Sequence, residues 1–474
     1  MWLELDQNSG LSLSWQIYGR LKKLILKGDL AAGNRLPSSR SLSRELNLAR
    51  NTVLEAYEQL IAEGYLETRP GSGTVVAAGL SIMENAVETA KCAPRPAESQ
   101  VKENKEIINF RSGIPDLEAF PKKDWARLYQ KVCGALPTAA FRYADPAGIW
   151  ELREAVSAYL FRVRGIRVPA RRVMICSGST QGLWLFARLL YRPGLKALTE
   201  DPAHTGLLEV VKRAGYTLKG LPVDAQGLET ETLNSLKPKD LERLAFIYTT
   251  PSHQYPLGGL MPAGRRQALI RFARKTGCLI VEDDYDSEFR YEGPPVGSLF
   301  ELAPETVIYL GSFSKILAPA LRLGFALIPE NMIDVWRAEK NYTDVHTDSP
   351  SQYALAEFIN SGALERHIWK MKKIYQRKRL HLMRCLSESF KDAFEIKGQA
   401  TGLHLVAAFP GRSFGPEFLA ECSGQGLKVG TVEQHSLAWD GSHSHELIMG
   451  YSHLSKTDIE EGVKRLKAGM GFNS

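Results

Sequence analysis

The segment GSFSKILAPALRLG places a lysine, Lys315, between Ser312 and Arg322, three side chains that together suit one kind of chemistry. The unprotonated amine of a lysine attacks an aldehyde and forms a Schiff base with it. A serine hydroxyl and an arginine guanidinium bind phosphate, the arginine through a forked, charge-assisted contact. A single lysine after a strand is usually solvated, but this combination is not typical of a surface lysine. The segment therefore favours a lysine that reacts with a phosphorylated aldehyde.

An acidic segment, IVEDDYDSEF, precedes this lysine and ends a predicted strand. Asp283 lies 32 residues before Lys315. A buried carboxylate opposite a pyridine nitrogen keeps that nitrogen protonated, which tunes an electron-withdrawing ring. Tyr285 is placed to hydrogen-bond a hydroxyl group on the same ring. The alternative for this segment is a solvated acidic loop or a metal site.

A third segment, SGSTQG over residues 177–182, joins the apolar run VMIC to the helical run LWLFARLL. Small residues there leave backbone N–H groups able to bind a phosphate at a helix N-terminus, where the helix dipole favours anions. Alone this signal is weak, because strand–turn–helix junctions often contain glycine and serine for the geometry of the turn.

The elements that must position these side chains are alternating strands and helices. Short β-branched runs such as RRVMIC, LAFIYTT, CLIVEDD and TVIYLGSF alternate with helical stretches after about residue 110. The alternation predicts βαβ units, a mostly parallel sheet and an α/β fold class. Ligands bind such sheets at the carboxyl ends of the strands, which is where the three segments lie.

The first 78 residues are organised differently. Hydrophobic spacing predicts one helix from about Ser14 to Lys27 and a short second helix after LPSS, with Ser38 or Ser39 as its N-cap. A third helix is expected from near Ala49. GYLETRPGSGTVV then predicts two strands around a glycine-rich turn, which is the pattern of a hairpin.

Polar side chains gather at the start of the third predicted helix, where Arg50, Asn51 and Thr52 follow one another. In helix-turn-helix readers this end of the helix enters the major groove, and Arg and Asn bond guanine and adenine edges. The alternative is a small helical interaction domain with Arg50 on a solvated face.

Residues 79–108 separate the two regions and show weak hydrophobic periodicity, two prolines and charges of both signs. This composition predicts a flexible tether. The alternative, a surface loop, is less favoured because structureless loops of such length are uncommon. The predicted domains are therefore 1–78, the linker 79–108, and 109–474.

Composition sets limits on partners and location. The net charge of +7 permits a polyanionic partner, but residues 1–79 contain 9 Lys and Arg against 8 Asp and Glu, so DNA binding depends on where the charges lie. Six cysteines without C-x-x-C spacing favour reduced thiols in the cytoplasm, and we expect no metal site. No signal peptide is expected, and no run approaches the about 18 apolar residues of a membrane span.

The string GDLAAGNRLPSSRSLSRELNLARNTVLEAYEQLIAEGYLETRPGSGTVV resembles the GntR family of winged-helix transcription regulators. The resemblance implies that double-stranded operator DNA is a partner. It also implies a set of DNA contacts in the second helix, the third helix and the wing, namely Arg40, Arg50, Asn51, Thr52, Ser72 and Gly73.

The segments after residue 110 resemble a fold-type I, aminotransferase-like domain that binds pyridoxal 5′-phosphate (PLP), with a smaller C-terminal α+β subdomain formed mainly after about Asp348. The resemblance implies an imine at Lys315, a contact of Asp283 with the ring nitrogen and one of Tyr285 with the ring oxygen. It implies a phosphate site made of Ser179, Thr180, Ser312 and Arg322. The segment FRYADPAGIWELREAVSAYL is similar to one in which a tyrosine, here Tyr143, reaches the partner subunit's phosphate.

A GntR-type reader followed by a linker and such a domain is the organisation of the MocR subfamily, which this chain resembles in order and spacing. The resemblance implies a homodimer of head-to-tail subunits, with each reader lying over the other subunit. It also implies a domain used for sensing rather than for turnover, although some transaminase activity remains compatible with it.

Three segments depart from the related patterns. His453 stands in LIMGYSHL, where aminotransferase-like domains usually carry the arginine that holds a substrate carboxylate. In EDPAHTG, His204 takes the place of an aromatic residue that stacks on the ring, and Gly206 that of a second arginine found in the aminobutyrate-sensing type. Tyr255 takes the place of the asparagine that bonds the ring oxygen. A histidine is a poor fork for a carboxylate.

These departures leave three hypotheses, ordered by how well they fit. The first is a regulator of vitamin B6 synthesis or salvage for which PLP itself is the signal, as in the PdxR type of MocR regulator. The second is a MocR regulator that senses an amine or amino acid, such as aminobutyrate, with the missing arginines replaced by other residues. The third is an active aminotransferase with an incidental DNA-binding domain, against which the missing carboxylate clamp argues.

Overall fold

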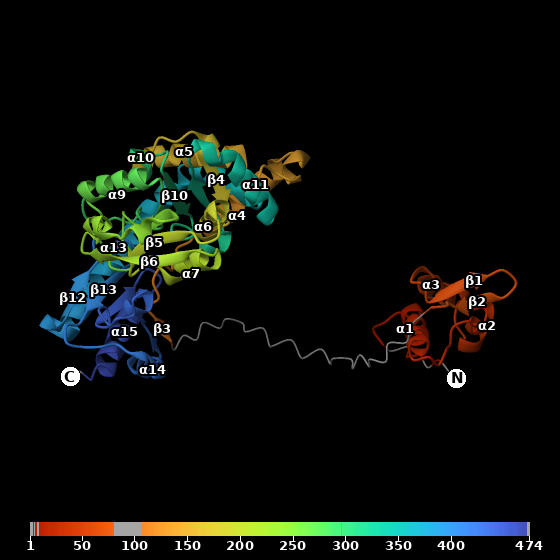
Figure 1. The fold of residues 1–474 in the computed structure, drawn as a ribbon. Coiled ribbons are helices and arrows are strands. Elements are labelled where there is room, and N and C mark those ends of the chain that lie inside the picture. Colours follow the sequence, from red (N-terminus) through yellow and green to blue (C-terminus); the bar gives the residue numbers. More distant parts are fainter. Residues whose placement is uncertain (1–2, 4, 7–8, 80–106, 295, 472–474) are drawn as a thin grey trace. The chain divides into compact units, whose positions relative to one another are not determined.

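The computed structural model describes residues 3, 5–6, 9–79, 107–294 and 296–471. The chain forms two compact units, Met1–Val101 and Lys102–Ser474 (Figure 1). Each described part has its own hydrophobic core. The predicted tether falls almost wholly on residues 80–106, which lie outside the described residues.

The first unit is a winged-helix fold. Its elements are α1 (Leu13–Leu26), α2 (Ser39–Leu46), α3 (Arg50–Ala62), β1 (Leu66–Arg69) and β2 (Gly73–Val76). The apolar residues at helical spacing, among them Ile17, Leu21 and Val53, meet in one core. Ser38 caps α2, because its hydroxyl accepts from the N–H of Ser41. The predicted helices and hairpin are confirmed.

An eight-stranded sheet in the order β4-β11-β10-β9-β8-β5-β6-β7 forms the centre of the second unit. Its strands are β4 (Val173–Cys176), β5 (Lys196–Asp201), β6 (Thr217–Asp224), β7 (Gly227–Leu228), β8 (Leu244–Thr249), β9 (Leu279–Asp284), β10 (Val307–Ser312) and β11 (Gly324–Leu327). The five from β10 to β6 are mutually parallel, while β11 and β7 run antiparallel to their neighbours. The predicted mostly parallel sheet and α/β class are confirmed.

Helices cover both faces of this sheet, so its strands are buried on both sides. They are α4 (Lys122–Ala135), α5 (Trp150–Arg164), α6 (Ser179–Leu190), α7 (Thr205–Arg213), α8 (Pro238–Leu241), α9 (Ala263–Thr276), α10 (Leu299–Leu302), α11 (Ile333–Asp344) and α12 (Ser349–Asn360). Successive strand residues face opposite cores: Ile280 packs in the cluster with α5, α9 and α12, and Val281 in the cluster with α6, α7 and α11.

Short 3-10 turns connect several of these elements. They are η1 (Thr138–Phe141), η2 (Ala170–Arg172), η3 (Thr230–Ser235), η4 (Pro319–Leu321), η5 (Glu330–Met332), η6 (Lys391–Ala393) and η7 (Glu433–His435).

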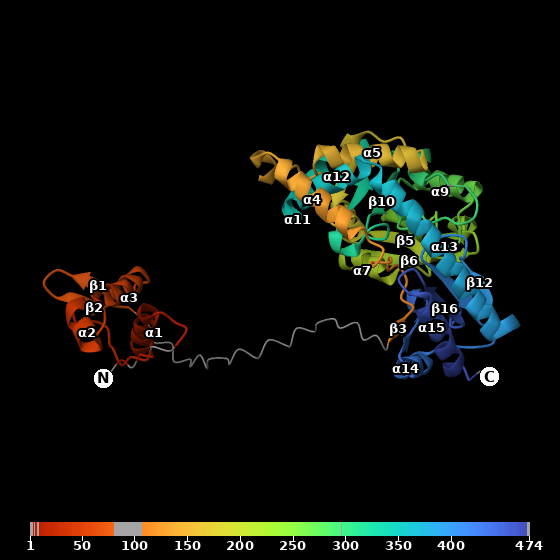
Figure 2. The same cartoon turned by 180° about the vertical axis from the view of Figure 1, so that it is seen from behind.

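A smaller α+β part follows, as predicted. It contains α13 (Ala363–Phe390), β12 (Glu395–Lys397), β13 (His404–Ala408), α14 (Pro416–Gly424), β14 (Leu427–Lys428), β15 (Gly430–Thr431), β16 (Glu446–Gly450) and α15 (Lys456–Gly469). Its antiparallel sheet has the order β12-β13-β16-β15. The long helix α13 leads from the large part to the small one (Figure 2). Because α12 packs on α4 and α5, the small part begins later than the expected boundary near Asp348.

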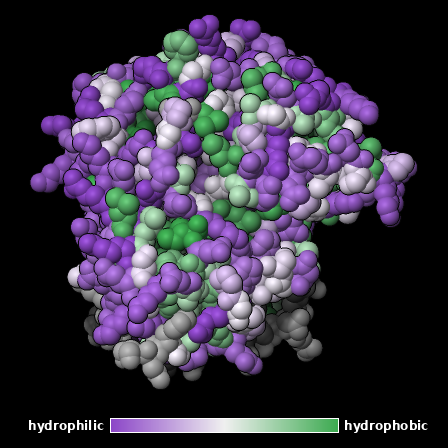
Figure 3. Space-filling view, turned by 90° about the vertical axis from the view of Figure 1, so that its left-hand side faces the viewer, coloured by the Kyte–Doolittle hydropathy of each residue, from purple (hydrophilic) through white to green (hydrophobic). Residues whose placement is uncertain are grey.

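The start of the second unit also joins the small part. Strand β3 (Ile108–Asn109) pairs with β14 in parallel, which carries the segment after it toward the edge of the large sheet. One face of this unit shows mostly hydrophilic residues with hydrophobic ones in small groups between them (Figure 3). None of the helices in the described ranges is long and apolar enough to cross a lipid bilayer.

Candidate functional site

Lys315 follows β10 at the edge of the sheet where the parallel strands end. Its Nζ donates a hydrogen bond to the carbonyl oxygen of Gly113 at 2.6 Å. Burial lowers the pKa of the Lys315 ammonium; Asp286 opposes this effect and Arg111 adds to it. A lowered pKa leaves more of the amine unprotonated at neutral pH, which is the form that attacks an aldehyde.

Asp283 is buried at the end of β9, and only one of its two carboxylate oxygens is satisfied. The hydroxyl of Tyr248, from β8, donates to Oδ2 at 2.7 Å. Oδ1 is buried without a hydrogen-bond partner in the described part of the chain. Burial raises the pKa of this carboxyl group to about 7. Because buried polar atoms are nearly always hydrogen-bonded, a partner for Oδ1 is expected to come from a ligand.

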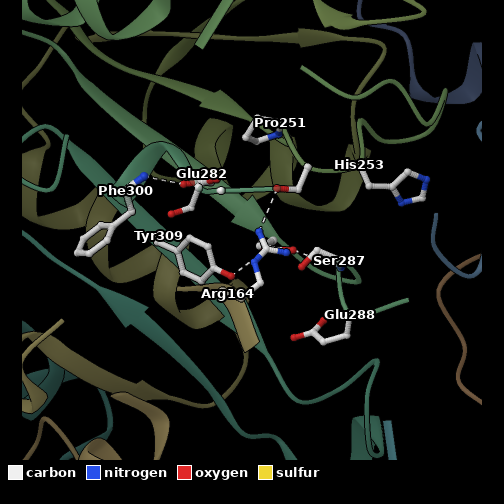
Figure 4. Close-up of polar contacts among 12 residues, drawn as sticks. Arg164, Pro251, His253, Glu282, Ser287, Glu288, Phe300 and Tyr309 are labelled. Atoms are coloured by element: carbon white, nitrogen blue, oxygen red, sulfur yellow. Dashed lines mark hydrogen bonds and ion pairs between the residues drawn. The ribbon is translucent and has the colours of Figure 1, made fainter. Parts of the chain in front are cut away.

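The two acids that flank Asp283 in β9 point to the opposite face of the sheet, as the alternation of a strand requires. Glu282 accepts hydrogen bonds from backbone N–H groups, among them that of Phe300 at 2.9 Å. Asp284 forms an ion pair with Arg164 at 2.9 Å and accepts from the hydroxyl of Tyr309 at 2.6 Å. Figure 4 shows this cluster around the guanidinium of Arg164. These contacts fix the end of β9.

The predicted phosphate-binding residues come from a helix start, a strand end and a turn: Ser179 and Thr180 begin α6, Ser312 ends β10, and Arg322 follows η4. The residue before α6 is Gly178, with φ of 90°, and α6 has no side-chain cap. A Cβ on Gly178 would lie 2.8 Å from Nη2 of Arg322, so the guanidinium lies over the start of the helix. Arg322 also donates to the carbonyl of Ser177. The arrangement forms a cradle with uncapped N–H groups and one cation.

Three ring-bearing residues singled out from the sequence lie together at this edge. The rings of His204 and Tyr255 have centroids 5.1 Å apart, and those of Tyr255 and Tyr285 are 6.0 Å apart. The hydroxyl of Tyr255 lies 2.8 Å from Oγ of Ser112. The hydroxyl of Tyr285 lies 2.9 Å from Nδ1 of His253. Together they supply flat surfaces and hydroxyl groups next to Lys315.

The two positions where related domains carry arginine hold no such cation. Gly206 lies in the first turn of α7, where a Cβ would be 2.9 Å from Cε1 of His204. His453 lies after β16, and its Nε2 is 2.8 Å from the carbonyl oxygen of Asn109 in β3. The imidazole therefore holds backbone at the point where an arginine was expected to hold a carboxylate.

Tyr143 is 88% exposed, and its ring contacts that of His346 at a centroid distance of 6.1 Å. No contact joins it to the Lys315 loop within the described residues of this chain. The structure thus does not bring Tyr143 to the predicted cofactor site of its own subunit, and its role toward a partner subunit stays a prediction.

The predicted DNA contacts occupy the exposed side of the first unit: Arg40 on α2, Arg50, Asn51 and Thr52 in the first turn of α3, and Ser72 and Gly73 at the tip of the hairpin. Nε of Arg50 lies 3.4 Å from Oγ of Ser39, so this arginine spans from α3 to α2. Arg35 was not predicted. Its backbone forms an isolated antiparallel β-bridge with Val75, and its guanidinium lies 3.6 Å from an ideal Cβ on Gly73.

Further residues of the Lys315 site were also missed. Tyr248 holds Asp283, His253 pairs with Asp286 at 2.8 Å, and Arg111 lies two residues before the Gly113 carbonyl that Lys315 contacts. His253 lies two residues before Tyr255 in the motif PSHQYPLGG, and this closeness in sequence was the signal that could have placed it at the site. Nothing in the local pattern distinguishes Tyr248 from any other residue of a buried strand.

Comparisons with known proteins agree with both units. Residues 105–412 match the family described as aminotransferase class I and II, and residues 13–76 match bacterial regulatory proteins of the gntR family. An archaeal alanine:glyoxylate aminotransferase is similar with a TM-score of 0.73 and 27% identity, covering 79% of this chain and 93% of that one. Kynurenine aminotransferase from Pyrococcus horikoshii, in complex with PMP, is similar with a TM-score of 0.72 and 27% identity. The match covers 78% of this chain and 92% of that one.

Relatives that cover most of this chain are named as regulatory proteins. The probable rhizopine catabolism regulatory protein MocR of Rhizobium meliloti is 31% identical over 99% of this chain and 96% of its own length. The pyridoxine biosynthesis transcriptional regulator PdxR of Corynebacterium glutamicum is 32% identical over 80% of this chain and 79% of its own length. The transcriptional regulator TauR of Rhodobacter capsulatus is 28% identical over 97% of this chain and 96% of its own length.

The fold and the site therefore define a class of protein: a DNA-binding regulator whose second domain has the fold of an aminotransferase. Within that class, the chain belongs to the MocR subfamily of GntR-family transcription regulators.

Proposed function

We propose that this protein is a PLP-responsive transcription regulator that controls genes of vitamin B6 synthesis or salvage. The observation that carries the proposal is the unsatisfied, buried Oδ1 of Asp283 beside a lysine of lowered pKa, in a chain that also has a DNA-reading unit. A protonated pyridine nitrogen would give Oδ1 its missing donor and an opposite charge. The aminotransferase fold supports PLP as the ligand.

The residues present fit this ligand group by group. Bound PLP would supply an aldehyde and an electron-withdrawing ring. Lys315 would bind the aldehyde carbon, Asp283 would hold the ring nitrogen, and Tyr285 with Tyr255 would bond the ring oxygen. His204 would cover one face of the ring. The phosphate would lie in the cradle of Ser179, Thr180, Ser312 and Arg322, with Tyr143 reaching the phosphate of a partner subunit in a head-to-tail homodimer.

The missing arginines favour PLP itself as the signal. An amino-acid effector needs a cation for its carboxylate, and neither Gly206 nor His453 supplies one. The similarity to a regulator named for pyridoxine biosynthesis supports the same choice. A ligand shifts a protein between two conformations only by binding one of them more tightly. PLP binding at Lys315 would therefore act on the operator-bound state by changing the arrangement of the two readers in the dimer.

The test is a titration of operator affinity with PLP, without any amine and then in the presence of single amino acids. We expect operator affinity to change with PLP alone and to saturate together with the visible absorbance of the imine. Lys315→Ala should bind the operator as the cofactor-free wild type does and should not respond to PLP. A response that requires an added amine would contradict the proposal.

A second candidate function is supported by one observation. The exposed Arg111 precedes by two residues the Gly113 carbonyl that Lys315 contacts, and it would hold the carboxylate of an amine effector in place of the two missing arginines. In that case the protein would be a MocR regulator that uses PLP to sense an amino acid. A change in operator affinity on adding one carboxylate-bearing amine to the PLP-saturated protein would favour this second function over the first.

A further inference from the structure

We propose that His253 and Asp286 form a buried pair that directs the hydroxyl hydrogen of Tyr285 into the cofactor site, toward the ring oxygen of bound PLP. His253 is then a positioning residue, because it acts on the ligand through Tyr285. The inference rests on the proposed binding of PLP at this site. It goes beyond that proposal because it assigns a role to two further residues and fixes the direction of one hydrogen bond.

The contacts of His253 and Asp286 are the first part of the evidence. Only 1% of each side chain is exposed. Nδ1 of His253 lies 2.8 Å from Oδ1 of Asp286 and 2.9 Å from the hydroxyl oxygen of Tyr285. One ring nitrogen therefore faces two oxygen atoms. An imidazole nitrogen carries either one hydrogen or one lone pair, so it cannot donate to one oxygen and accept from the other.

The surroundings decide which of the two Nδ1 carries. An ionised carboxylate only accepts, so the contact with Asp286 requires a hydrogen on Nδ1. Nε2 of His253 is buried and has no hydrogen-bond partner within the described part of the chain. A hydrogen on Nε2 would be a buried donor without an acceptor, and the lone pair of Nδ1 would then face a carboxylate. The tautomer with its hydrogen on Nδ1 avoids both costs.

This tautomer leaves the Tyr285 hydroxyl with one role. Its oxygen accepts from the N–H of His253, so its own hydrogen has to point elsewhere. Among the described residues, Nδ1 of His253 is the hydrogen-bond partner of this hydroxyl, so no other protein acceptor there competes for the hydrogen. A ring oxygen next to Lys315 would receive it. A chain in which an N–H donates to a hydroxyl that donates onward is polarised, which strengthens both bonds.

Close packing at Gly402 holds the pair in place. A Cβ on Gly402, whose φ is 87°, would lie 2.2 Å from Cε1 of His253 and 2.5 Å from Oδ2 of Asp286. The carbonyl oxygen of Gly402 accepts from the hydroxyls of Tyr291 and Tyr451, each at 2.7 Å. The imidazole therefore cannot turn away from Asp286 unless this segment moves.

The charged and titratable groups nearby are compatible with this direction of donation. Burial, with Asp286 next in effect, raises the pKa of Tyr285 well above its ordinary value, so the phenol keeps its hydrogen. The ring of His404 lies 5.2 Å from that of His253, and burial lowers the pKa of His404 to about 4, so it is neutral at physiological pH. The charge of Asp286 also acts directly on Lys315. The test therefore changes His253 and leaves Asp286 in place.

The first measurement is the pH dependence of the visible imine absorbance, which gives the pKa of the imine between Lys315 and PLP. A hydrogen bond donated to the ring oxygen stabilises its anionic form and lowers this pKa. Tyr285→Phe removes the donor and should raise the imine pKa by about one to two units, since a hydrogen bond to a charged group is lost.

Two substitutions of similar size then separate the role of the N–H from that of the side-chain volume. His253→Leu should raise the imine pKa by half the shift of Tyr285→Phe or more, because the Tyr285 hydroxyl can then turn to Asp286. In His253→Asn the amide N–H takes the place of the N–H at Nδ1, so the imine pKa should stay close to that of the wild type. An imine pKa in His253→Leu equal to that of the wild type would overturn the proposal.

A double variant tests whether His253 acts through Tyr285. His253→Leu combined with Tyr285→Phe should have the same imine pKa as Tyr285→Phe alone, because the hydroxyl that His253 directs is already absent. A further rise in the double variant would mean that His253 acts on the site in another way, and the positioning role would be wrong. Thermal unfolding of each variant shows that it is folded.

The tautomer is measured independently in the cofactor-free wild type by ¹⁵N NMR of histidine-labelled protein. The signal of His253 is identified by its absence in His253→Asn. We expect a hydrogen on Nδ1, and an Nδ1 without hydrogen would overturn the proposal even if His253→Leu does not fold. If the wild type shows no imine absorbance with PLP, the proposed function fails and the role toward the ring fails with it. Normal absorbance with an unchanged imine pKa in His253→Leu overturns the positioning role alone.

Discussion

Replacement of Asp283 by asparagine should have opposite effects on two properties of the protein. The change keeps the shape of the side chain and its neighbour Tyr248, but it removes the charge. In the cofactor-free protein that charge lowers the free energy of unfolding. Oδ1 has no donor within the described residues, and burial raises the pKa of the carboxyl group from 3.8 to about 7. In the PLP-bound protein the same charge would face a protonated nitrogen and would be stabilising.

The magnitude follows from the two pKa values. The pKa of the Asp283 carboxyl group is higher in the folded protein than in the unfolded chain. The protonated group therefore favours folding, and the ionised group opposes it. Its full contribution is present below about pH 4 and is lost as the pH rises to about 7. The loss amounts to at most about 4 kcal/mol above pH 7 and about 1.5 kcal/mol at pH 5. Asp283→Asn avoids this loss, so its advantage in unfolding free energy should be about 3 kcal/mol larger at pH 8 than at pH 5.

The assay is urea unfolding of the cofactor-free protein, followed for the second unit, at pH 5 and pH 8, with a PLP titration of both proteins at pH 8. The titration should show an affinity about 10 to 100 times weaker for Asp283→Asn, because a hydrogen bond between charged groups is lost. Glu388→Gln, a change of an exposed acid on α13, is the control, since its solvated side chain should give the same small difference at both pH values. A stability difference between Asp283→Asn and wild type that does not depend on pH would refute the reasoning.

Three further predictions concern other parts of the chain. Lys315→Ala should remove the visible imine absorbance with PLP while leaving operator affinity of the cofactor-free protein unchanged, and a persistent absorbance band would show that another amine reacts. Arg50→Ala should weaken operator binding by about 1–3 kcal/mol in fluorescence anisotropy if Arg50 reads a base; an unchanged affinity would remove it from the interface. Gly178→Ala should lower PLP affinity at least about tenfold, since its φ of 90° suits glycine and a Cβ would meet Arg322 at 2.8 Å, costing of order 1–3 kcal/mol. Equal PLP affinity of Gly178→Ala and wild type in a fluorescence titration would place the phosphate elsewhere.

Local sequence patterns were sufficient to predict the helices and strands and the residues at their ends. Hydrophobic spacing predicted the helices of the first unit, and Ser38 caps α2 as expected. The β-branched runs became β4, β8, β9 and β10, and parallel pairing then brings Asp283 and Lys315 to one edge of the sheet. These outcomes follow from signals within about ten residues of sequence, because helix and strand periodicity is a local property.

The partners of these residues depend instead on contacts between distant parts of the chain. Tyr248 on β8 contacts Asp283 on the neighbouring strand β9, and Lys315 contacts the carbonyl of Gly113, which lies 202 residues earlier in the chain. The expected subdomain boundary near Asp348 shifted for the same reason, since α12 packs on α4 and α5. The hydrophobic periodicity of a helix or strand carries no information about such long-range contacts, because they form only when separate elements pack together.

The amino-acid order by itself thus predicted the chemistry proposed for this protein: a lysine, an acid and a phosphate site, each at the end of its own strand or helix. Packing decided the ionisation and the surroundings of those groups. Burial sets the pKa of Asp283, and the bond from His453 to Asn109 sets the course of the segment that carries Arg111. Desolvation and long-range contacts exist only in the folded chain, so only the three-dimensional arrangement could reveal them.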